Sequence, residues 1–150
     1  MAGSEHTILE VTASETHPLR LAVLRTETTS RDPVYPGDEL ASTRHLAIAD
    51  QDGRLVAVST WIVEAFPDET DGTGLHLRGM ATDEAHRGRG LGAALLDAGR
   101  ARATELGADT VWARARVTAR TFYEQHGFRI VGAEFVDETS GLPHVLARLP

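Results

Sequence analysis

The chain has 150 residues, of which 41% are hydrophobic and 25% charged, and it contains no Cys. This length suits one domain with a single core, and the composition is that of a globular protein. The lack of Cys excludes disulfide frameworks, thiolate metal sites and a Cys nucleophile. All 15 basic residues are Arg and the net charge is -7. This charge argues against general nucleic-acid binding and favours cationic small molecules as partners.

No segment of the sequence predicts secretion or insertion into a membrane. The first residues lack a basic region followed by an apolar one, and no apolar run approaches the ~20 residues that span a bilayer. No linker or internal repeat divides the chain. We therefore expect one cytoplasmic domain over residues 1–150, with neither membrane nor nucleic acid as a partner.

The first half of the chain predicts a strand, a helix and a hairpin, in that order. Residues 6–11 predict the strand, and the apolar spacing in residues 19–25 predicts the helix. Residues 29–42 contain two Pro and one Gly, which is typical of an irregular loop, and loops of this length often face a substrate. Residues 45–49 and 55–63 flank a short Asp-Gly turn, so we expect a β-hairpin.

The pattern then predicts an acidic loop at 67–74, a strand at 75–82 and a helix at 91–106 that stops at a glycine. Alternation along the strand predicts two faces. One face is expected to carry Leu75, Leu77, Gly79 and Ala81, and the other His76, Arg78, Met80 and Thr82.

The last third of the chain predicts a strand at 110–115 and a short helix with Thr118 as its N-cap and Gly127 at its end. Residues 128–135 predict another strand, and residues 143–149 an edge strand or a hairpin partner. The order of elements, hairpins followed by alternating strands and helices, is typical of an α/β or α+β domain with a mixed sheet.

The segment between the strand at 75–82 and the following helix is rich in glycine and arginine: His86-Arg87-Gly88-Arg89-Gly90-Leu91-Gly92. Alternate glycines let the backbone approach a ligand closely. The start of the helix supplies unpaired N–H groups and the positive end of its dipole, and arginine side chains suit phosphate. Together these features predict a cradle for a pyrophosphate group.

The glycine-rich turn has three other interpretations besides a pyrophosphate cradle. A Walker loop needs a Lys, which the chain lacks. Ala93 permits a dinucleotide-binding fingerprint, but no acidic residue ends a following strand and the preceding sequence predicts hairpins. A plain glycine-rich turn with solvated arginines stays open.

The stretch from Gly79 to Gly99 resembles the GCN5-related N-acetyltransferase (GNAT) superfamily. The acetyl-CoA loop of that family, [QR]-x-x-G-x-[GA], is matched by Arg87, Gly90 and Gly92. A second motif of the family, A-x-x-[FL]-Y-x-x-x-G-F, is similar to the run that starts at Ala119, includes Phe122-Tyr123 and ends at Gly127-Phe128. The resemblance covers residues 43–135 and implies a single domain with a mixed, mostly antiparallel central sheet flanked by helices.

The resemblance implies an acetyl-CoA-dependent N-acetyltransferase that acts on a primary amine by direct attack in a ternary complex. It places the pantetheine and the acetyl carbonyl on backbone groups of Met80, Ala81 and Thr82. It places the CoA pyrophosphate on backbone N–H groups of Arg87, Gly88, Arg89, Gly90, Leu91, Gly92 and Ala93. The seven His show no H-x-x-x-H or comparable spacing, so we expect no metal site.

The resemblance makes Tyr123 the candidate general acid, because a phenol with a pKa near ~10 is protonated at neutral pH and can protonate the departing sulfur. The alternative is that Tyr123 is an ordinary core residue. Three residues are candidates for the general base: Glu64 at the end of a strand, His76 on the expected face of Met80, and His144 in a G-x-P-H stretch. Each of the three is open to a structural role instead.

One residue departs from the family pattern. Where the family often has Asn, three residues before Ala119, this chain has Arg116, which either reaches a phosphate or is solvated. Because of this departure and the lack of a clear base, a catalytically inactive acyl-CoA-binding sensor or interaction module is the alternative function. A nucleotide-phosphate binder is a more distant one.

The sequence does not identify the acceptor, for which any small-molecule or peptide amine is a candidate. Three acidic residues are expected to form a solvated rim that attracts a cationic acceptor: Asp68, Glu69 and Asp71. An exposed edge strand would support a homodimer.

Overall fold

The computed structural model describes residues 6–149, so residues 1–5 and 150 of the expected domain lie outside the described part. The strands are β1 (Leu9–Val11), β2 (Arg44–Ala49), β3 (Leu55–Val63), β4 (Gly74–Thr82), β5 (Thr110–Arg116), β6 (Arg129–Val136) and β7 (Pro143–Leu149). The helices are α1 (Ala13–Leu19), α2 (Leu91–Leu106) and α3 (Arg120–Gln125). Shorter turns are the π-helical η2 (Arg20–Leu24) and the 3-10 turns η3 (Glu84–His86) and η4 (Val117–Ala119).

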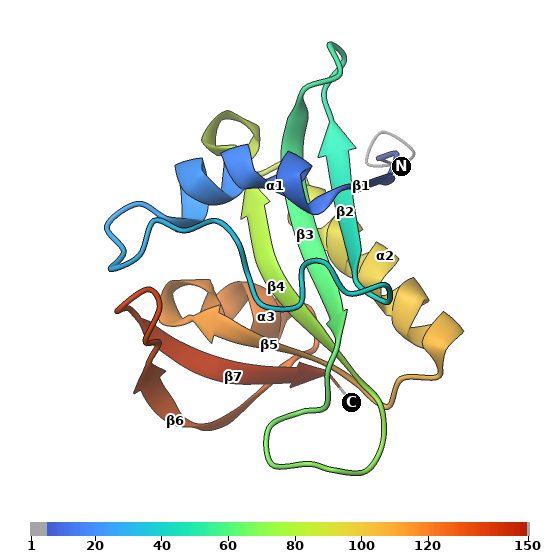
Figure 1. The fold of residues 1–150 in the computed structure, drawn as a ribbon, viewed down its shortest axis with the longest axis vertical. Coiled ribbons are helices and arrows are strands. Elements are labelled where there is room, and N and C mark those ends of the chain that lie inside the picture. The colour runs from blue at the N-terminus through green and yellow to red at the C-terminus, as the bar shows by residue number, and fades with distance from the viewer. Residues whose placement is uncertain (1–5, 150) are drawn as a thin grey trace.

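The seven strands form one sheet in the order β1-β2-β3-β4-β5-β7-β6 (Figure 1). Strands β4 and β5 run parallel, and every other neighbouring pair is antiparallel. The sheet confirms the expected mixed, mostly antiparallel architecture and the hairpin formed by β2 and β3. Among the described residues, no helix has the length and apolar character needed to cross a membrane.

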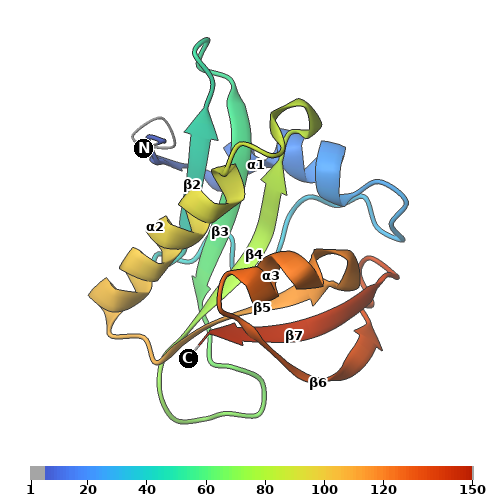
Figure 2. The ribbon, with the colours of Figure 1, turned by 180° about the vertical axis from the view of Figure 1, so that it is seen from behind.

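Helices cover both faces of the sheet. Helix α1 and η2 lie over the face seen in Figure 1, and α2 and α3 lie over the opposite face, seen in Figure 2. The main core lies between the sheet and α2 with α3, and includes the buried residues Trp61, Leu75 and Leu96. Helix α2 approaches the sheet closely at Gly99, where an added Cβ would lie 2.0 Å from the ring of Trp61. A smaller core under α1 contains Leu19.

The first helix begins earlier than the apolar spacing predicts. It starts at Ala13, because Thr12 forms a capping box with Glu15: the Thr12 side chain accepts the Glu15 N–H, and the Glu15 carboxylate accepts the Thr12 N–H at 2.8 Å. Pro18 lies inside the helix. Since Pro has no N–H to donate, the regular hydrogen-bond ladder is interrupted there, and the helix continues as the π-helical turn η2.

One further expectation about the elements is wrong, and another is confirmed in one of its two alternatives. Thr118 is not an N-cap: it lies inside η4, and α3 begins after Ala119 without a side-chain cap. Residues 143–149 do not form an edge strand, although they are the expected hairpin partner of β6. Strand β7 lies between β5 and β6 and pairs antiparallel with both, and its residues Val145 and Ala147 are buried in the main core. Gly127 does adopt a positive φ of 90° at the end of α3, as expected.

Candidate active site

A cavity opens where the two parallel strands separate. Strands β4 and β5 pair only from Gly74 with Thr110 to Leu77 with Ala113, and they diverge beyond that point (Figure 1). A cavity of about 150 Å³ lies in this opening, between residues 78–80 of β4 and residues 114–116 of β5. The β4 edge beyond Leu77 therefore has no strand partner on the β5 side, and its backbone groups are available to a ligand.

A β-bulge in β4 sets which side chains face this cavity. Ala81 pairs with Val58 and Arg78 pairs with Thr60, so Ser59 alone lies opposite Gly79 and Met80. The extra residue reverses the alternation of side chains beyond Gly79.

The bulge corrects the predicted faces of this strand. Met80 packs on the α2 side with the core of Leu75 and Leu77, and Ala81 packs on the α1 side beside Leu19. His76 and Met80 therefore do not share a face, contrary to the sequence-based expectation. The bulge needs a glycine, because Gly79 has a φ of +60° and a Cβ there would lie 2.8 Å from the Tyr35 ring.

Of the three β4 residues expected to bind the pantetheine, one lines the cavity. Met80 is half-buried at the cavity wall, Ala81 is buried under α1, and Thr82 pairs with Ala57 of β3. The structure thus brings the β4 backbone to the opening, and of these three residues Met80 alone lines the cavity.

The glycine-rich turn is exposed and open. Gly88 and Gly90 have φ values of +80° and +77°, and a Cβ added at either would meet no atom within 4 Å. Backbone hydrogen bonding in α2 begins with the Ala94 N–H, which donates to the Gly90 carbonyl at 3.0 Å. The N–H groups of residues 91–93 come before this bond, so they have no partner within the helix and lie at the positive end of its dipole. The turn therefore offers open space and unpaired N–H groups, the features that an anion needs at the start of a helix.

Gly92 has a different reason to be glycine. A Cβ there would lie 3.1 Å from the ring of Phe122, so the missing side chain lets the start of α2 approach α3. The first turn of α2 is in this way fixed next to the helix that carries Tyr123.

Glu64 and His76, expected separately as bases, form a hydrogen-bonded pair. The Glu64 Oε1 atom lies 2.8 Å from His76 Nδ1. The His76 ring is 2% exposed and stacks on Trp112, with ring centroids 3.7 Å apart. Burial lowers the pKa of His76, which the Glu64 carboxylate partly opposes. The hydrogen bond from His76 in turn lowers the pKa of Glu64.

These shifts define the state of the imidazole at neutral pH. With a lowered pKa the ring is neutral, and its Nδ1–H donates to the Glu64 carboxylate. The Nε2 atom then carries the free lone pair, and it is buried without a hydrogen-bond partner among the described residues. His76 lines the cavity, so this pair combines an unused proton acceptor with a carboxylate that orients it.

Tyr123 lines the same cavity from the other face of the sheet. Its ring is 8% exposed and packs edge-on against Phe122 and Phe128, with centroids 5.3 and 5.1 Å away. Burial raises the pKa of the phenol above its ordinary value of 10.0, so the hydroxyl keeps its proton at neutral pH. His144 lines the cavity as well, and its Nδ1 lies 2.9 Å from the Leu142 carbonyl oxygen.

The expected acidic rim is not at this site. Asp68, Glu69 and Asp71 lie on the loop between β3 and β4 and do not line the cavity, and Glu69 pairs with Arg148 at 2.6 Å. The cavity wall is instead rich in arginine: Arg25, Arg78, Arg114 and Arg116. The sequence offers no local signal for this cluster, because its members come from three separate segments.

Two features from the sequence analysis lie at the cavity wall. The irregular loop at 29–42 contributes Tyr35 to the cavity wall. Arg116 is not simply solvated: its guanidinium donates to the Leu24 carbonyl and lines the cavity. Within residues 6–149, no three His, Asp or Glu side chains are grouped so that they could hold a metal ion.

An open turn at the start of α2, beside two parallel strands that separate, is the arrangement that the resemblance to the GNAT superfamily predicts. Sequence comparison agrees: the model of the acetyltransferase (GNAT) domain matches residues 42–130, and the chain belongs to this family. The uncharacterized N-acetyltransferase YitI of Bacillus subtilis (strain 168) is 26% identical over 125 residues, which is 83% of each chain.

Solved structures show the same fold. An acyl-CoA N-acyltransferase from Pseudomonas aeruginosa superposes with a TM-score of 0.76 at 22% identity, over 97% of this chain and 100% of that one. ElaA from Escherichia coli superposes with a TM-score of 0.76 at 20% identity, over the same shares of the two chains. At these identities the likeness extends to the fold and not to the acceptor.

Proposed function

We propose that the protein is an acetyl-CoA-dependent N-acetyltransferase that acetylates a primary amine by direct attack in a ternary complex. The observation that carries this proposal is the open turn at the start of α2, adjacent in the chain to the free edge of β4. The first suits a diphosphate, and the second offers backbone groups to an extended arm that ends in the cavity.

The residues that would hold acetyl-CoA follow from this geometry. Backbone N–H groups of residues 88–93 would bind the diphosphate; the Arg87 N–H, expected in the same set, donates to the Glu84 carbonyl at 3.4 Å. Backbone groups of residues 80–82 would bind the pantetheine and the acetyl carbonyl. Acetyl-CoA, as second substrate, supplies the acetyl group as a thioester. N–H donors aimed at the carbonyl oxygen stabilise the charge that develops there, an effect typically worth a few kcal/mol.

His76 is the proposed base. An alkyl amine with a pKa of ~10.4 is mostly charged at neutral pH, and neutralising it costs roughly 4 kcal/mol. The neutral His76 ring can take the amine proton at Nε2, directly or through a water, while Glu64 holds the ring in position. We assign Glu64 as a positioning residue.

Tyr123 is the proposed acid. Its buried phenol keeps its proton until negative charge develops on the leaving sulfur. In the net reaction a new N–C bond forms and the C–S bond of the thioester breaks. The ammonium group loses two protons in all: one is released, and the other is balanced by the proton that CoA gains at sulfur.

Thiol release from acetyl-CoA, measured with a panel of amines, tests the function. We expect Tyr123→Phe to lower kcat by roughly 10²–10⁴-fold, because the ring stays and only the acid is lost. The CoA affinity and the melting temperature of this variant, which should match the wild type, are the controls. Wild-type turnover by the variant would make Tyr123 a core residue. CoA binding without thiol release for any amine would support the inactive sensor module instead.

A further inference from the structure

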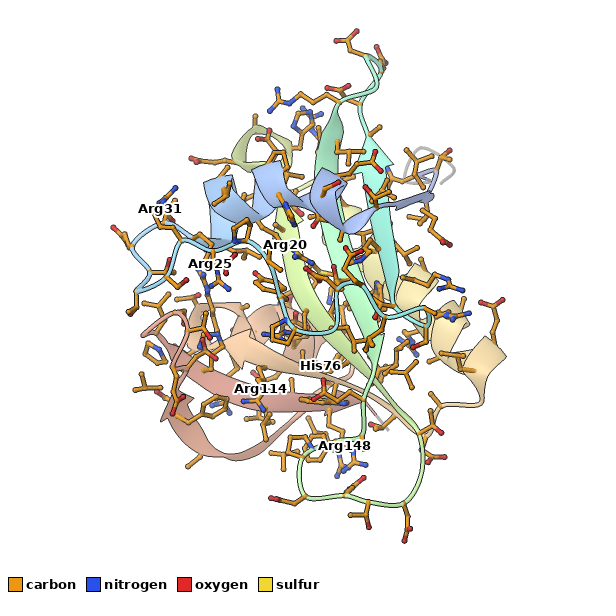
Figure 3. The ribbon with its side chains drawn as sticks, in the orientation of Figure 1. Arg20, Arg25, Arg31, His76, Arg114 and Arg148 are labelled. Carbon is orange, nitrogen blue, oxygen red and sulfur yellow. The ribbon has the colours of Figure 1, made fainter. Side chains whose placement is uncertain are left out.

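The arginine cluster (Arg25, Arg78, Arg114 and Arg116) concentrates positive charge in the cavity of a chain whose net charge is -7. Figure 3 shows Arg25 above and Arg114 below the opening between β4 and β5, with His76 beside Arg114. Asp137 is the one carboxylate among the described residues that line the cavity. A cavity lined by one sign of charge raises the local concentration of the opposite ion.

None of the four guanidinium groups forms an ion pair within residues 6–149. The two nearby carboxylates form hydrogen bonds with groups other than these arginines: Asp137 accepts the Ser140 N–H at 2.9 Å, and Glu64 accepts the His76 N–H. Arg20, in contrast, lies close by and forms an ion pair with Asp38 through two hydrogen bonds. Four arginines thus lie near two carboxylates, which attract Arg78 without a direct ion pair, and the cluster keeps an excess of positive charge.

Arg78 and Arg114 have the fewest partners in the cluster. Arg25 donates to the Asp32 carbonyl at 3.1 Å and Arg116 donates to the Leu24 carbonyl, whereas no such bond from Arg78 or Arg114 is present in the described part of the chain. Arg78 is half-buried beside the Tyr35 ring, with its guanidinium carbon 4.9 Å from the ring centroid, whereas Arg114 is exposed. Partial burial of the Arg78 guanidinium without an anionic partner is costly, and a bound anion would offset this cost.

The position of the pair relative to His76 suits an acceptor rather than the CoA diphosphate. Arg78 and Arg114 follow the last paired residues, Leu77 and Ala113, and lie on the face of His76 and Trp112. The start of α2 lies over the opposite face (Figure 2). One step of two residues along a strand, about 6.6 Å, separates the arginine pair from the proposed base.

We propose that the acceptor carries a carboxylate close to its reactive amine, as an amino acid does, and that Arg78 and Arg114 bind this carboxylate. The proposal rests on the proposed function, since it names the substrate class of the same cavity. The forked guanidinium matches a carboxylate with two parallel hydrogen bonds. A cavity of about 150 Å³ holds a molecule the size of benzene, which suits a small amino acid.

In the reaction this predicts, the α-ammonium loses one proton and its nitrogen bonds the acetyl carbon as the C–S bond breaks. A second amine proton is lost from the nitrogen and CoA gains one at sulfur, so the products are an N-acetyl amino acid and CoA thiol. The carboxylate takes no part in the bond changes and serves only for recognition.

Matched pairs of acceptors test the proposal. Each L-amino acid is compared with its carboxamide in the thiol-release assay, and 2-aminoethyl phosphate is compared with ethanolamine to separate carboxylate from phosphate. We expect kcat/KM for the best amino acid to exceed that for its amide by about tenfold or more. The α-amine of an amide has a pKa of only about 8, so the fraction of neutral amine favours the amide, and a preference for the acid must come from recognition.

Charge-removing variants identify the residues. Arg78→Gln and Arg114→Gln should each raise the KM for the amino acid about tenfold or more and leave the KM for acetyl-CoA unchanged. Arg129→Gln is the matched control, because Arg129 is exposed on β6 and does not line the cavity. Binding of N-acetylglycine and of N-acetylglycinamide, measured by calorimetry, gives a readout that needs no turnover.

The outcomes separate the two proposals. Equal rates for acids and amides, a preference for the phosphate-bearing amine or for polyamines, or unchanged KM values in both variants would overturn the carboxylate site. If no amine releases thiol but N-acetylglycine binds and the variants lose that binding, the carboxylate site stands and the transferase function fails. If neither thiol release nor binding of N-acetylglycine is found, both proposals are overturned.

Discussion

His76 shows how neighbours convert a single residue into a candidate base. Trp112 stacks on its ring, Glu64 binds its Nδ1, and burial keeps the imidazole neutral. An exposed histidine would be partly protonated near its ordinary pKa of 6.5 and free to rotate. The surroundings of His76 therefore provide both a protonation state and an orientation, which the residue type alone does not.

The pH profile of Glu64→Gln tests this assignment. The base must be neutral, so kcat should rise with pH through the pKa of His76, which lies below 6.5. The Glu64 carboxylate raises that pKa, so its removal should shift this acidic limb to lower pH and lower kcat by about 10- to 100-fold. Glu69→Gln removes a carboxylate that pairs with Arg148 outside the cavity, and it should leave the limb in place. An unmoved limb in Glu64→Gln would exclude His76 as the base.

At the scale of elements, helix α2 connects the open turn to the sheet. Its first turn offers the backbone N–H groups of residues 91–93, and its middle packs onto Trp61 through Gly99. Its last turn ends at Gly107, which also has a positive φ, of +66°. The helix thus starts and ends with left-handed glycines, but only the first adjoins the proposed diphosphate site.

This symmetry offers a matched pair of variants. The substitutions Gly90→Ala and Gly107→Ala each cost roughly 1–2 kcal/mol of backbone strain, and in neither variant does the added Cβ meet an atom within 4 Å. Only Gly90→Ala places a methyl group where the diphosphate is expected, so its Kd for CoA should rise about tenfold, as measured by calorimetry. Gly107→Ala, about 24 Å away along the helix, should bind CoA like the wild type. Equal affinities for the two variants would remove the turn from the binding site.

At the scale of the whole molecule, a buried ion pair ties three segments together on the α1 side of the sheet. The guanidinium of Arg20 in η2 donates to Asp38 at 2.7 and 3.0 Å and to Thr60 of β3 at 2.7 Å. Asp38 also accepts the N–H of Tyr35 at 2.9 Å, and the Tyr35 ring stacks under Arg20 at 4.0 Å. The network holds the irregular loop against the sheet and keeps Tyr35 at the cavity wall.

Loss of one partner should therefore destabilise the whole fold. The side chains of Arg20 and Asp38 are 0% and 2% exposed, so Asp38→Ala leaves a buried, unpaired guanidinium and should lower the free energy of unfolding by about 3–5 kcal/mol. Denaturant titration measures this change. The double variant Arg20→Met/Asp38→Leu removes both charges and should recover most of the loss. A loss below 1 kcal/mol in Asp38→Ala would show that the network is not a structural tie.

The sequence by itself determined the features that depend on neighbouring residues: the β2–β3 hairpin, the helix that follows Gly90, the open turn and the motif around Tyr123. Turn residues, capping glycines and apolar spacing act within a few residues, so they can be recognised from the sequence alone. The capping box of Thr12 and Glu15 is equally local, and its residue pattern marks the start of that helix, which apolar spacing alone does not.

The tertiary structure alone decided the bulge at Gly79, the pairing of Glu64 with His76 and the arginine cluster around the cavity. Each depends on strand register or on the point at which β4 and β5 separate, and these are set by packing between segments that are distant in the chain. A shift of one residue moves every later side chain to the other face, so the inward-facing residues follow from the assembled sheet and not from the local pattern.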